Sequence, residues 1–139
     1  MKRLFSILFL LLICQKSLAC ECEVKQSVKV NWNASNTIFV GKVIQRSSEV
    51  KSDGSLIFIY EFQINTIYKS ASRNKKLSEK MYFHIKNNCG YVFEVDREYL
   101  IYANQSGNSN SFECSICSRT DILKNIKKEE LSYLKKLKK

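Results

Sequence analysis

The sequence predicts a mainly β protein, a single domain built as a small closed or nearly closed barrel of five strands with flanking helices. Three observations lead to this prediction. Five short runs rich in β-branched and aromatic residues are separated by turn signals. The last stretch of the chain is amphipathic with a helical period. About 120 residues follow an N-terminal leader, which is enough for one domain.

The first 19 residues have the composition of a secretory signal peptide. Lys2 and Arg3 form its basic start, residues 4–13 its apolar centre, and Ser17 and Ala19 its small residues before the cleavage site. The apolar centre is shorter than the roughly 20 residues that span a bilayer. We therefore expect a mature chain of residues 20–139 that is exported, either secreted or periplasmic.

A cysteine directly after the leader also allows a lipid anchor. The lipidation signal expects a branched apolar residue three positions before the cleavage site, where this chain has Ser17. This residue favours ordinary cleavage, which would make Cys20 the mature N-terminus with a free α-amine. Lipid anchoring at Cys20 is the alternative.

Five cysteines remain in the mature chain. Loss of the leader removes Cys14 and three basic residues, so the formal charge falls from +10 to +7. In an oxidising compartment the remaining cysteines are first interpreted as disulfides. An odd number leaves one thiol, and the spacing alone leaves fifteen ways of drawing two bonds open.

The first elements of the mature chain are a helix and a strand. Val28 and Trp32 stand at helical spacing within residues 23–36, which predicts a short amphipathic helix. Residues 37–44 are β-branched and aromatic and predict a strand. Gly41 within that strand indicates a bulge or bend.

A hairpin turn at Asp53-Gly54 leads to the second predicted strand, residues 56–68. The side chains of this strand alternate, so that one face is buried and the other is solvated. The buried face comprises Phe58, Tyr60, Phe62 and Ile64, and the solvated face Glu61, Gln63 and Asn65.

A polar, basic segment, residues 69–80, predicts a surface loop before the remaining strands. These strands, which complete an antiparallel set, are expected at residues 81–85, 99–103 and 112–117, the last after a turn at 105–111. From Asp121 onward we expect an amphipathic helix. Its apolar face comprises Leu123, Ile126, Leu131, Leu134 and Leu137.

Four motifs follow one another along the mature chain: Cys20-Glu21-Cys22; Ile38-Phe39-Val40-Gly41-Lys42-Val43; Cys89-Gly90-Tyr91 with Tyr99-Leu100-Ile101-Tyr102-Ala103; and Cys117-Ser118-Arg119-Thr120. In this order and spacing they resemble the bacterial branch of the netrin-like family, whose best known members are the tissue inhibitors of metalloproteinases. The resemblance spans essentially the whole mature chain. It implies an OB-like closed barrel of five strands with a C-terminal helix.

The resemblance also implies two disulfides, Cys20 with Cys89 and Cys22 with Cys117, and it leaves Cys114 as the free thiol. Alternate residues of an extended segment point to the same side, so Cys20 and Cys22 can both reach the barrel rim. Each bridge would close a loop of many tens of residues, worth on the order of 4 kcal/mol by chain entropy. A bond between Cys22 and Cys114 remains the rival pairing.

In the inhibitors that this chain is similar to, the α-amine and the carbonyl oxygen of the first residue chelate the catalytic zinc of the target. Carried over, this role falls to Cys20, while Glu21 enters the specificity pocket of the target with Cys22 beside it. The two bridges would preorganise this segment. A carboxylate entering an apolar pocket is costly, so Glu21 points to a metalloproteinase with a polar or basic pocket.

The alternative is a non-inhibitory role, in which the bridges serve only to staple the N-terminus of an extracytoplasmic protein- or polyanion-binding module. The lysines are concentrated in residues 69–80 and in the final helix and are not interleaved with aromatics. This pattern disfavours nucleic acid and leaves weak contact with an anionic surface through the Lys-rich C-terminal helix as an alternative.

The sequence offers little for catalysis or for a bound metal. Cys114-Ser115-Ile116-Cys117 together with Cys20 and Cys22 could form a four-thiolate zinc site, but export into an oxidising compartment argues against it. His84 is the single histidine, and no carboxylate pair or phosphate-binding loop accompanies it. We therefore expect a protein that is not an enzyme and that holds no cofactor or metal of its own.

Overall fold

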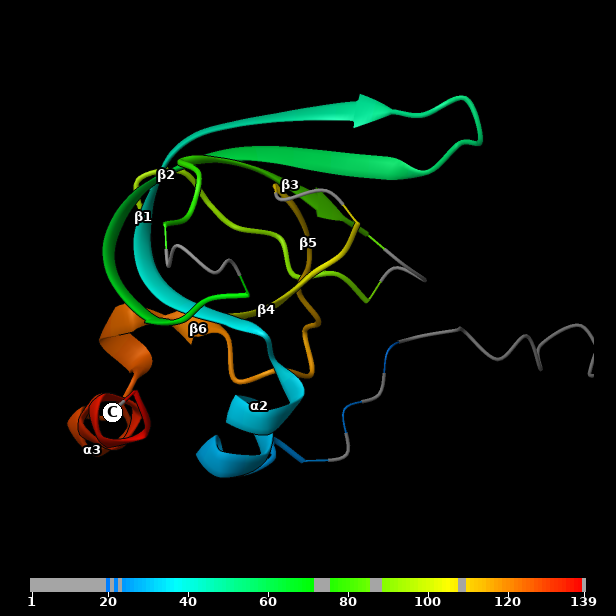
Figure 1. The fold of residues 1–139 in the computed structure, drawn as a ribbon. Helices are drawn as coiled ribbons and strands as arrows, with labels where there is room; N and C mark the ends of the chain where they lie inside the picture. Colours follow the sequence, from blue (N-terminus) through cyan, green and yellow to red (C-terminus); the bar gives the residue numbers. More distant parts are fainter. Residues whose placement is uncertain are drawn as a thin grey trace, which may run out of the picture.

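The computed structural model describes residues 20, 22, 24–71, 76–85, 89–107 and 110–138. The predicted leader and Glu21 lie outside the described residues. The fold is mainly β with a C-terminal helix, as the sequence predicts (Figure 1). Among the described residues, no helix has the length and apolar character needed to cross a membrane.

Five strands form a closed ring, because the first strand pairs with the second on one edge and with the fourth on the other. A short sixth strand pairs with Tyr99 and Leu100 of the fourth. The sheet order is β1-β2-β3-β5-β4-β6. The strands are β1 (Thr37–Val50), β2 (Leu56–Lys69), β3 (Lys80–His84), β4 (Glu98–Gln105), β5 (Ser111–Glu113) and β6 (Asp121–Ile122).

One pairing corrects the expectation of an antiparallel set: β3 and β5 run parallel, while the other paired strands are antiparallel. The parallel arrangement is possible because a long connection, which contains β4, separates β3 from β5.

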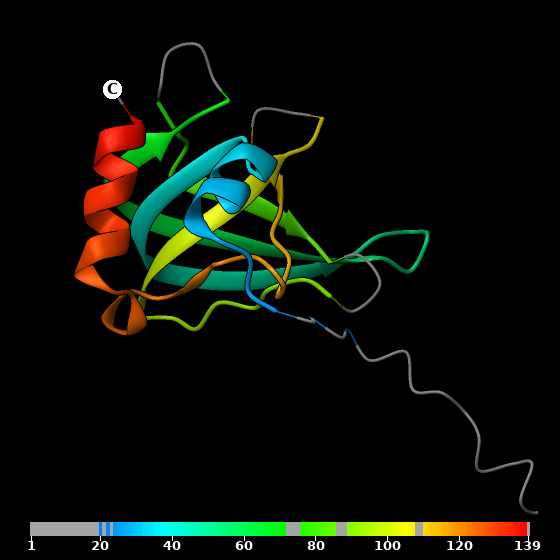
Figure 2. The ribbon, with the colours of Figure 1, turned by 90° about the horizontal axis from the view of Figure 1, so that it is seen from below.

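The hairpin of β1 and β2 is longer than predicted, and its tip projects beyond the ring (Figures 1 and 2). The predicted turn at Asp53-Gly54 is confirmed. Gly54 has a φ of 79°, a conformation that favours glycine, and Asp53 accepts a hydrogen bond from the backbone amide of Ser55 at 2.9 Å. The register of β1 shifts between Val40 and Gly41, so the irregularity predicted at Gly41 is present.

Aromatic side chains fill the inside of the ring. Phe93 lies at their centre, with its ring centroid 5.1 to 5.7 Å from those of Tyr60, Phe62, Phe83 and Tyr99. Tyr60 and Phe62 are buried while Glu61 and Gln63 are exposed, which confirms the alternation predicted for β2. The predicted surface loop 69–80 contributes Leu77 to this core.

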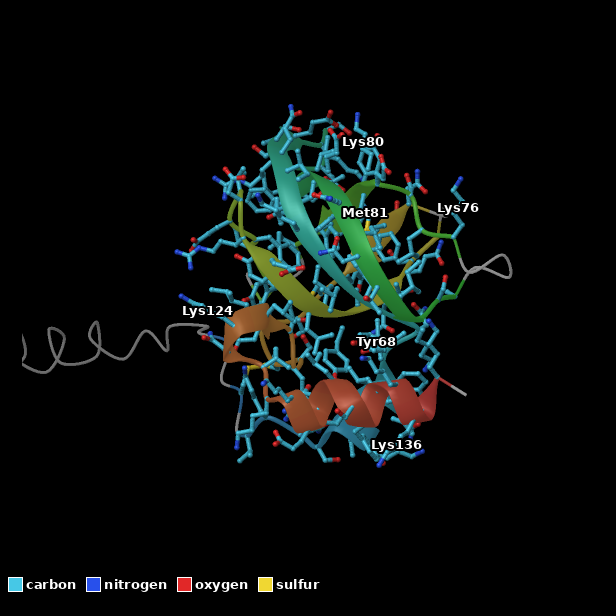
Figure 3. All side chains as sticks on the ribbon, turned by 90° about the vertical axis from the view of Figure 1, so that its left-hand side faces the viewer. Tyr68, Lys76, Lys80, Met81, Lys124 and Lys136 are labelled. Carbon is cyan, nitrogen blue, oxygen red and sulfur yellow. A yellow bond between two sulfur atoms is a disulfide. The ribbon has the colours of Figure 1, made fainter. Side chains whose placement is uncertain are left out.

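A second apolar cluster lies between the outside of the ring and the helices α2 (Val28–Ala34) and α3 (Lys128–Leu137). Leu134 of α3 is fully buried there against Tyr68, Leu100 and Tyr102, and Figure 3 shows Tyr68 between β2 and α3. The helix predicted from residue 121 begins only at Lys128. The intervening residues form β6 and the single 3-10 turn η1 (Leu123–Asn125).

Candidate functional site

Two disulfides fasten the N-terminal residues to the ring. Cys20 is bonded to Cys89 and Cys22 to Cys117, across sequence separations of 69 and 95 residues. These are the pairs that the resemblance implies, so in this structure Cys22 is not paired with the rival Cys114. Two disulfides are typical of a small domain from an oxidising, extracytoplasmic compartment.

Both disulfides are anchored on one platform, formed by the loops around Cys89 and Cys117. Gly90 and Ser115 form an isolated antiparallel β-bridge. On either side of it, the amide of Ile116 donates to the carbonyl of Cys89 at 3.0 Å and the amide of Tyr91 to that of Cys114 at 2.7 Å. Cys20 and Cys22 are therefore held by two chain segments that are themselves joined.

The fifth strand ends earlier than predicted, at Glu113 and not at residue 117, and this difference shapes the platform. After the bridge at Ser115 the chain turns. The Ser115 hydroxyl accepts from the amide of Cys117 at 3.1 Å, and the Ser118 hydroxyl donates to the carbonyl of Ser115 at 2.7 Å. Such side-chain bonds to the local backbone compete with a strand ladder.

Gly90 allows the platform to pack closely. A Cβ at this position would lie 2.1 Å from Cδ1 and 3.2 Å from Cα of Ile85. A larger residue would require the end of the Ile85 side chain to move and would press on its Cα.

Cys114, the remaining described cysteine, is free and buried. Its Sγ lies 3.2 Å from the Thr120 hydroxyl and 3.9 Å from that of Ser118. Burial raises the pKa of the thiol to about 11, although these hydrogen bonds oppose the shift. A buried thiol with a high pKa is a poor nucleophile and a poor metal ligand.

The four-thiolate zinc site considered above has no free ligand set in this structure. Cys20, Cys22 and Cys117 are in disulfides. Across the described residues, no group of three or more His, Cys, Asp and Glu side chains is placed to hold a metal ion.

The segment that leaves Cys22 is held by side chains that the sequence did not single out as binding residues. Nζ of Lys25 lies 3.3 Å from Oδ2 of Asp121, and Nη1 of Arg119 donates to the carbonyl of Gln26 at 3.0 Å. The backbone amide of Arg119 also donates to Oδ1 of Asn31 at 3.1 Å. The N-terminal segment is thus fixed well beyond its two disulfides.

Arg119 in turn pairs with Glu130 of α3, whose side chain is only 5% exposed. One signal could have revealed Glu130: it stands four residues from both Ile126 and Leu134, on the apolar face of the predicted helix. A carboxylate on such a face requires a buried partner.

The surface around the disulfides carries exposed aliphatic side chains. Val24, two residues after Cys22, is 79% exposed, and Ile116, next to Cys117, is 39% exposed. A groove of about 540 Å³ adjoins them. Its walls are polar and apolar in about equal measure and include Cys22, Val24, Asn31, Asn104, Ser115 and Cys117.

Lysines are exposed on α3, as expected: Lys128, Lys135 and Lys136 are all open to solvent, and Figure 3 shows Lys136 on the side of α3 away from the strands. Lys69 differs from them. Its Nζ donates to the carbonyls of Trp32 and Ser35 at 2.7 and 2.6 Å, so it secures the end of α2.

No protein-family model matches the chain, and no curated protein matches it in sequence.

Proposed function

We propose that this chain is an exported netrin-like domain with an OB-like barrel, and that its stapled N-terminus inhibits a zinc metalloproteinase. The observation that carries the proposal is the double attachment: both cysteines of Cys20-Glu21-Cys22 are bonded to one platform. Two disulfides hold this three-residue segment, whereas one disulfide is enough to tether the end of a chain.

The architecture supports the family part of the proposal. A ring of five strands closed between β1 and β4, with a helix packed on its outside, is what the OB-like barrel of the netrin-like family requires. Fold alone leaves function open, so the inhibitory role depends on the N-terminal segment.

The chemistry of inhibition would use main-chain atoms of Cys20. After cleavage of residues 1–19, its α-amine and carbonyl oxygen could together chelate the catalytic zinc of the target and displace the water from its open coordination position. An α-amine has a pKa near 8, so it loses its proton readily beside a metal ion. The zinc belongs to the target, and this chain supplies only the rigid chelating group.

The surface around this group indicates the chemistry of the partner. Exposed Val24 and Ile116 would contact apolar parts of the target's rim. Glu21, between the two stapled cysteines, would enter the specificity pocket and favours a target whose pocket is polar or basic.

The test compares the mature protein, beginning at Cys20, with a variant extended by one N-terminal alanine. Both are assayed against purified zinc metalloproteinases that include thermolysin as the reference probe. We expect the mature protein to inhibit at least one enzyme and the extended protein to lose inhibition while keeping both disulfides. Equal inhibition by the two proteins would exclude zinc chelation, and no inhibition by either would exclude the inhibitor role.

The exposed lysines of α3 support a second candidate, a non-inhibitory module that contacts an anionic surface weakly. Binding of this kind would fall steeply with added salt and would not depend on a free α-amine. Co-sedimentation with anionic lipid vesicles at low and high salt separates this candidate from inhibition.

A further inference from the structure

Arg119 makes contacts in three directions from the loop that follows Cys117. Its Nε donates to Oε1 of Glu130 at 2.9 Å, and its Nη2 donates to Oε2 of the same carboxylate. Its Nη1 donates to the carbonyl of Gln26, and its backbone amide to Asn31. One residue thus joins α3, the platform of the second disulfide and the segment that carries Cys22.

The α3 end of this connection is buried and held by a further hydrogen bond. Oε1 of Glu130 also accepts a hydrogen bond from the hydroxyl of Tyr102 at 2.9 Å, and Tyr102 is a buried residue of β4. Glu130 itself is buried, so its carboxylate is held between a strand of the ring and the guanidinium. A bidentate pair of this kind fixes the plane of the guanidinium and not merely its charge.

The other end of the connection fixes a short piece of chain. The carbonyl of Gln26, which accepts from Arg119, also accepts from the side chain of Asn31 at 3.4 Å. Between this point and Cys22 lie only three residues. The segment between Cys22 and α2 is therefore attached to Cys117 at one end and to Arg119 at the other. Cys117 and Arg119 are two residues apart in the sequence.

We propose that Arg119 is the positioning residue of the N-terminal segment: it uses Glu130 of α3 as a fixed support to hold the path of the chain between Cys22 and α2. The disulfides determine where Cys20 and Cys22 are attached, and Arg119 holds Gln26 at the point where the segment meets α2. The relevance of this role to inhibition rests on the function proposed above, whereas the role itself does not.

The test uses Arg119→Lys in the full mature protein. Lysine keeps the charge and can still meet Glu130, but one ammonium group cannot reproduce the planar fork to Glu130 together with the bond to Gln26. Amide hydrogen exchange, followed by NMR, provides the readout. We expect the amides of Asn31 and Arg119 to exchange about tenfold faster, while amides in the paired centre of β1 and β4 change less than about twofold.

This pattern separates positioning from general stabilisation. A residue that only stabilised the fold would, on substitution, accelerate the most protected amides of the sheet as well. Arg97→Lys is the matched control, because it makes the same chemical change in an exposed pair with Glu94. It should leave the exchange of Asn31 and Arg119 at the wild-type rate. Uniform acceleration in Arg119→Lys, or no change at Asn31, would overturn the proposal.

A second variant tests the support in α3. Glu130→Gln keeps the size of the side chain and an oxygen for Tyr102, but it replaces one acceptor with a donor that faces the guanidinium. We expect faster exchange at Asn31 here too, although residue 130 lies in a different element. If Asn31 kept its wild-type exchange rate in Glu130→Gln, α3 would not be the support.

The same variants show whether the role matters for inhibition. If the mature protein inhibits a metalloproteinase, Arg119→Lys should weaken inhibition about tenfold, because a loosened segment loses preorganisation. If exchange at Asn31 becomes faster but the protein inhibits no metalloproteinase, the positioning role stands and the inhibitory function is refuted. If exchange at Asn31 becomes faster and inhibition is unchanged, the inhibitory function stands and positioning by Arg119 does not contribute to inhibition.

Discussion

Single residues determine how closely the platform around Cys89 and Cys117 packs, and Gly90 is the clearest case. The absence of a side chain lets the Cys89 loop lie against Ile85 at the end of β3. The neighbouring backbone is committed to the bridge with Ser115, so the loop has little freedom to retreat.

Gly90→Ala should therefore lower the free energy of unfolding by about 1–3 kcal/mol, the usual cost of overpacking. Ile85→Val removes the Cδ1 atom that the new Cβ would meet at 2.1 Å. The double variant should recover part of the loss, which denaturant unfolding of the four proteins in this cycle would measure. Additive effects of the two substitutions would show that the close contact with Ile85 is not the reason for glycine.

Cys114 should be protected in the native protein although it carries a free thiol. Its pKa of about 11 leaves roughly one thiol in a thousand ionised at pH 8, and burial excludes the reagent. We expect no alkylation by iodoacetamide under native conditions and one added group after unfolding in guanidinium chloride, as intact mass would show. Labelling of the native protein at Cys114 would contradict the buried position.

The elements around the platform combine covalent and polar contacts, and Asp121 of β6 makes several of the polar ones. Asp121 accepts from the Ile122 amide at 2.7 Å, from Asn125 at 3.1 Å and from Lys25 at 3.3 Å. Burial tends to raise the pKa of Asp121, but these bonds together outweigh burial and lower it below its ordinary value of 3.8.

A pH dependence follows from this lowered pKa. Because the pKa of Asp121 is lower in the folded than in the unfolded chain, its contribution to stability is present above about pH 4 and is lost as the pH falls through the folded value. Asp121→Asn should flatten the fall in unfolding free energy below about pH 4, and Lys25→Met should do so in part. An unchanged slope in Asp121→Asn would show that Asp121 does not contribute to acid sensitivity.

Most elements of the ring could be predicted from the sequence because their signals are local. The alternation of apolar and polar residues predicts the strand at 56–68, and the residue types of Asp53-Gly54 predict the turn. The parallel pairing of β3 and β5 could not be predicted, since it depends on the path of the long intervening connection. The two residues of β6 are too few to show a period.

The candidate site could be predicted only in part: its disulfides were expected and its long-range polar contacts were not. The family resemblance implied both cystine pairs, which spacing alone left open. The contacts of Arg119 were not predicted, because Glu130 lies eleven residues away and Gln26 ninety-three. Only the placement of Glu130 on an apolar helix face hinted that a buried partner exists.

At the scale of the whole molecule, the helices and the projecting hairpin lie at opposite sides of the ring (Figures 1 and 2). The two disulfides and Arg119 connect the N-terminal segment to the ring and to α3. In the proposed function, what this arrangement presents is the α-amine and carbonyl of Cys20 with Glu21 beside them.

The central claim thus depends on whether the protein is exported with residue 20 as a free N-terminus. Intact mass combined with N-terminal sequencing of the protein recovered after export tests it most directly. The account predicts a chain that begins at Cys20 with an unmodified amine, four hydrogens lighter than the fully reduced sequence because of two disulfides. A lipid-modified Cys20, or an N-terminus at another residue, would contradict it, because neither leaves a free amine on a stapled first residue.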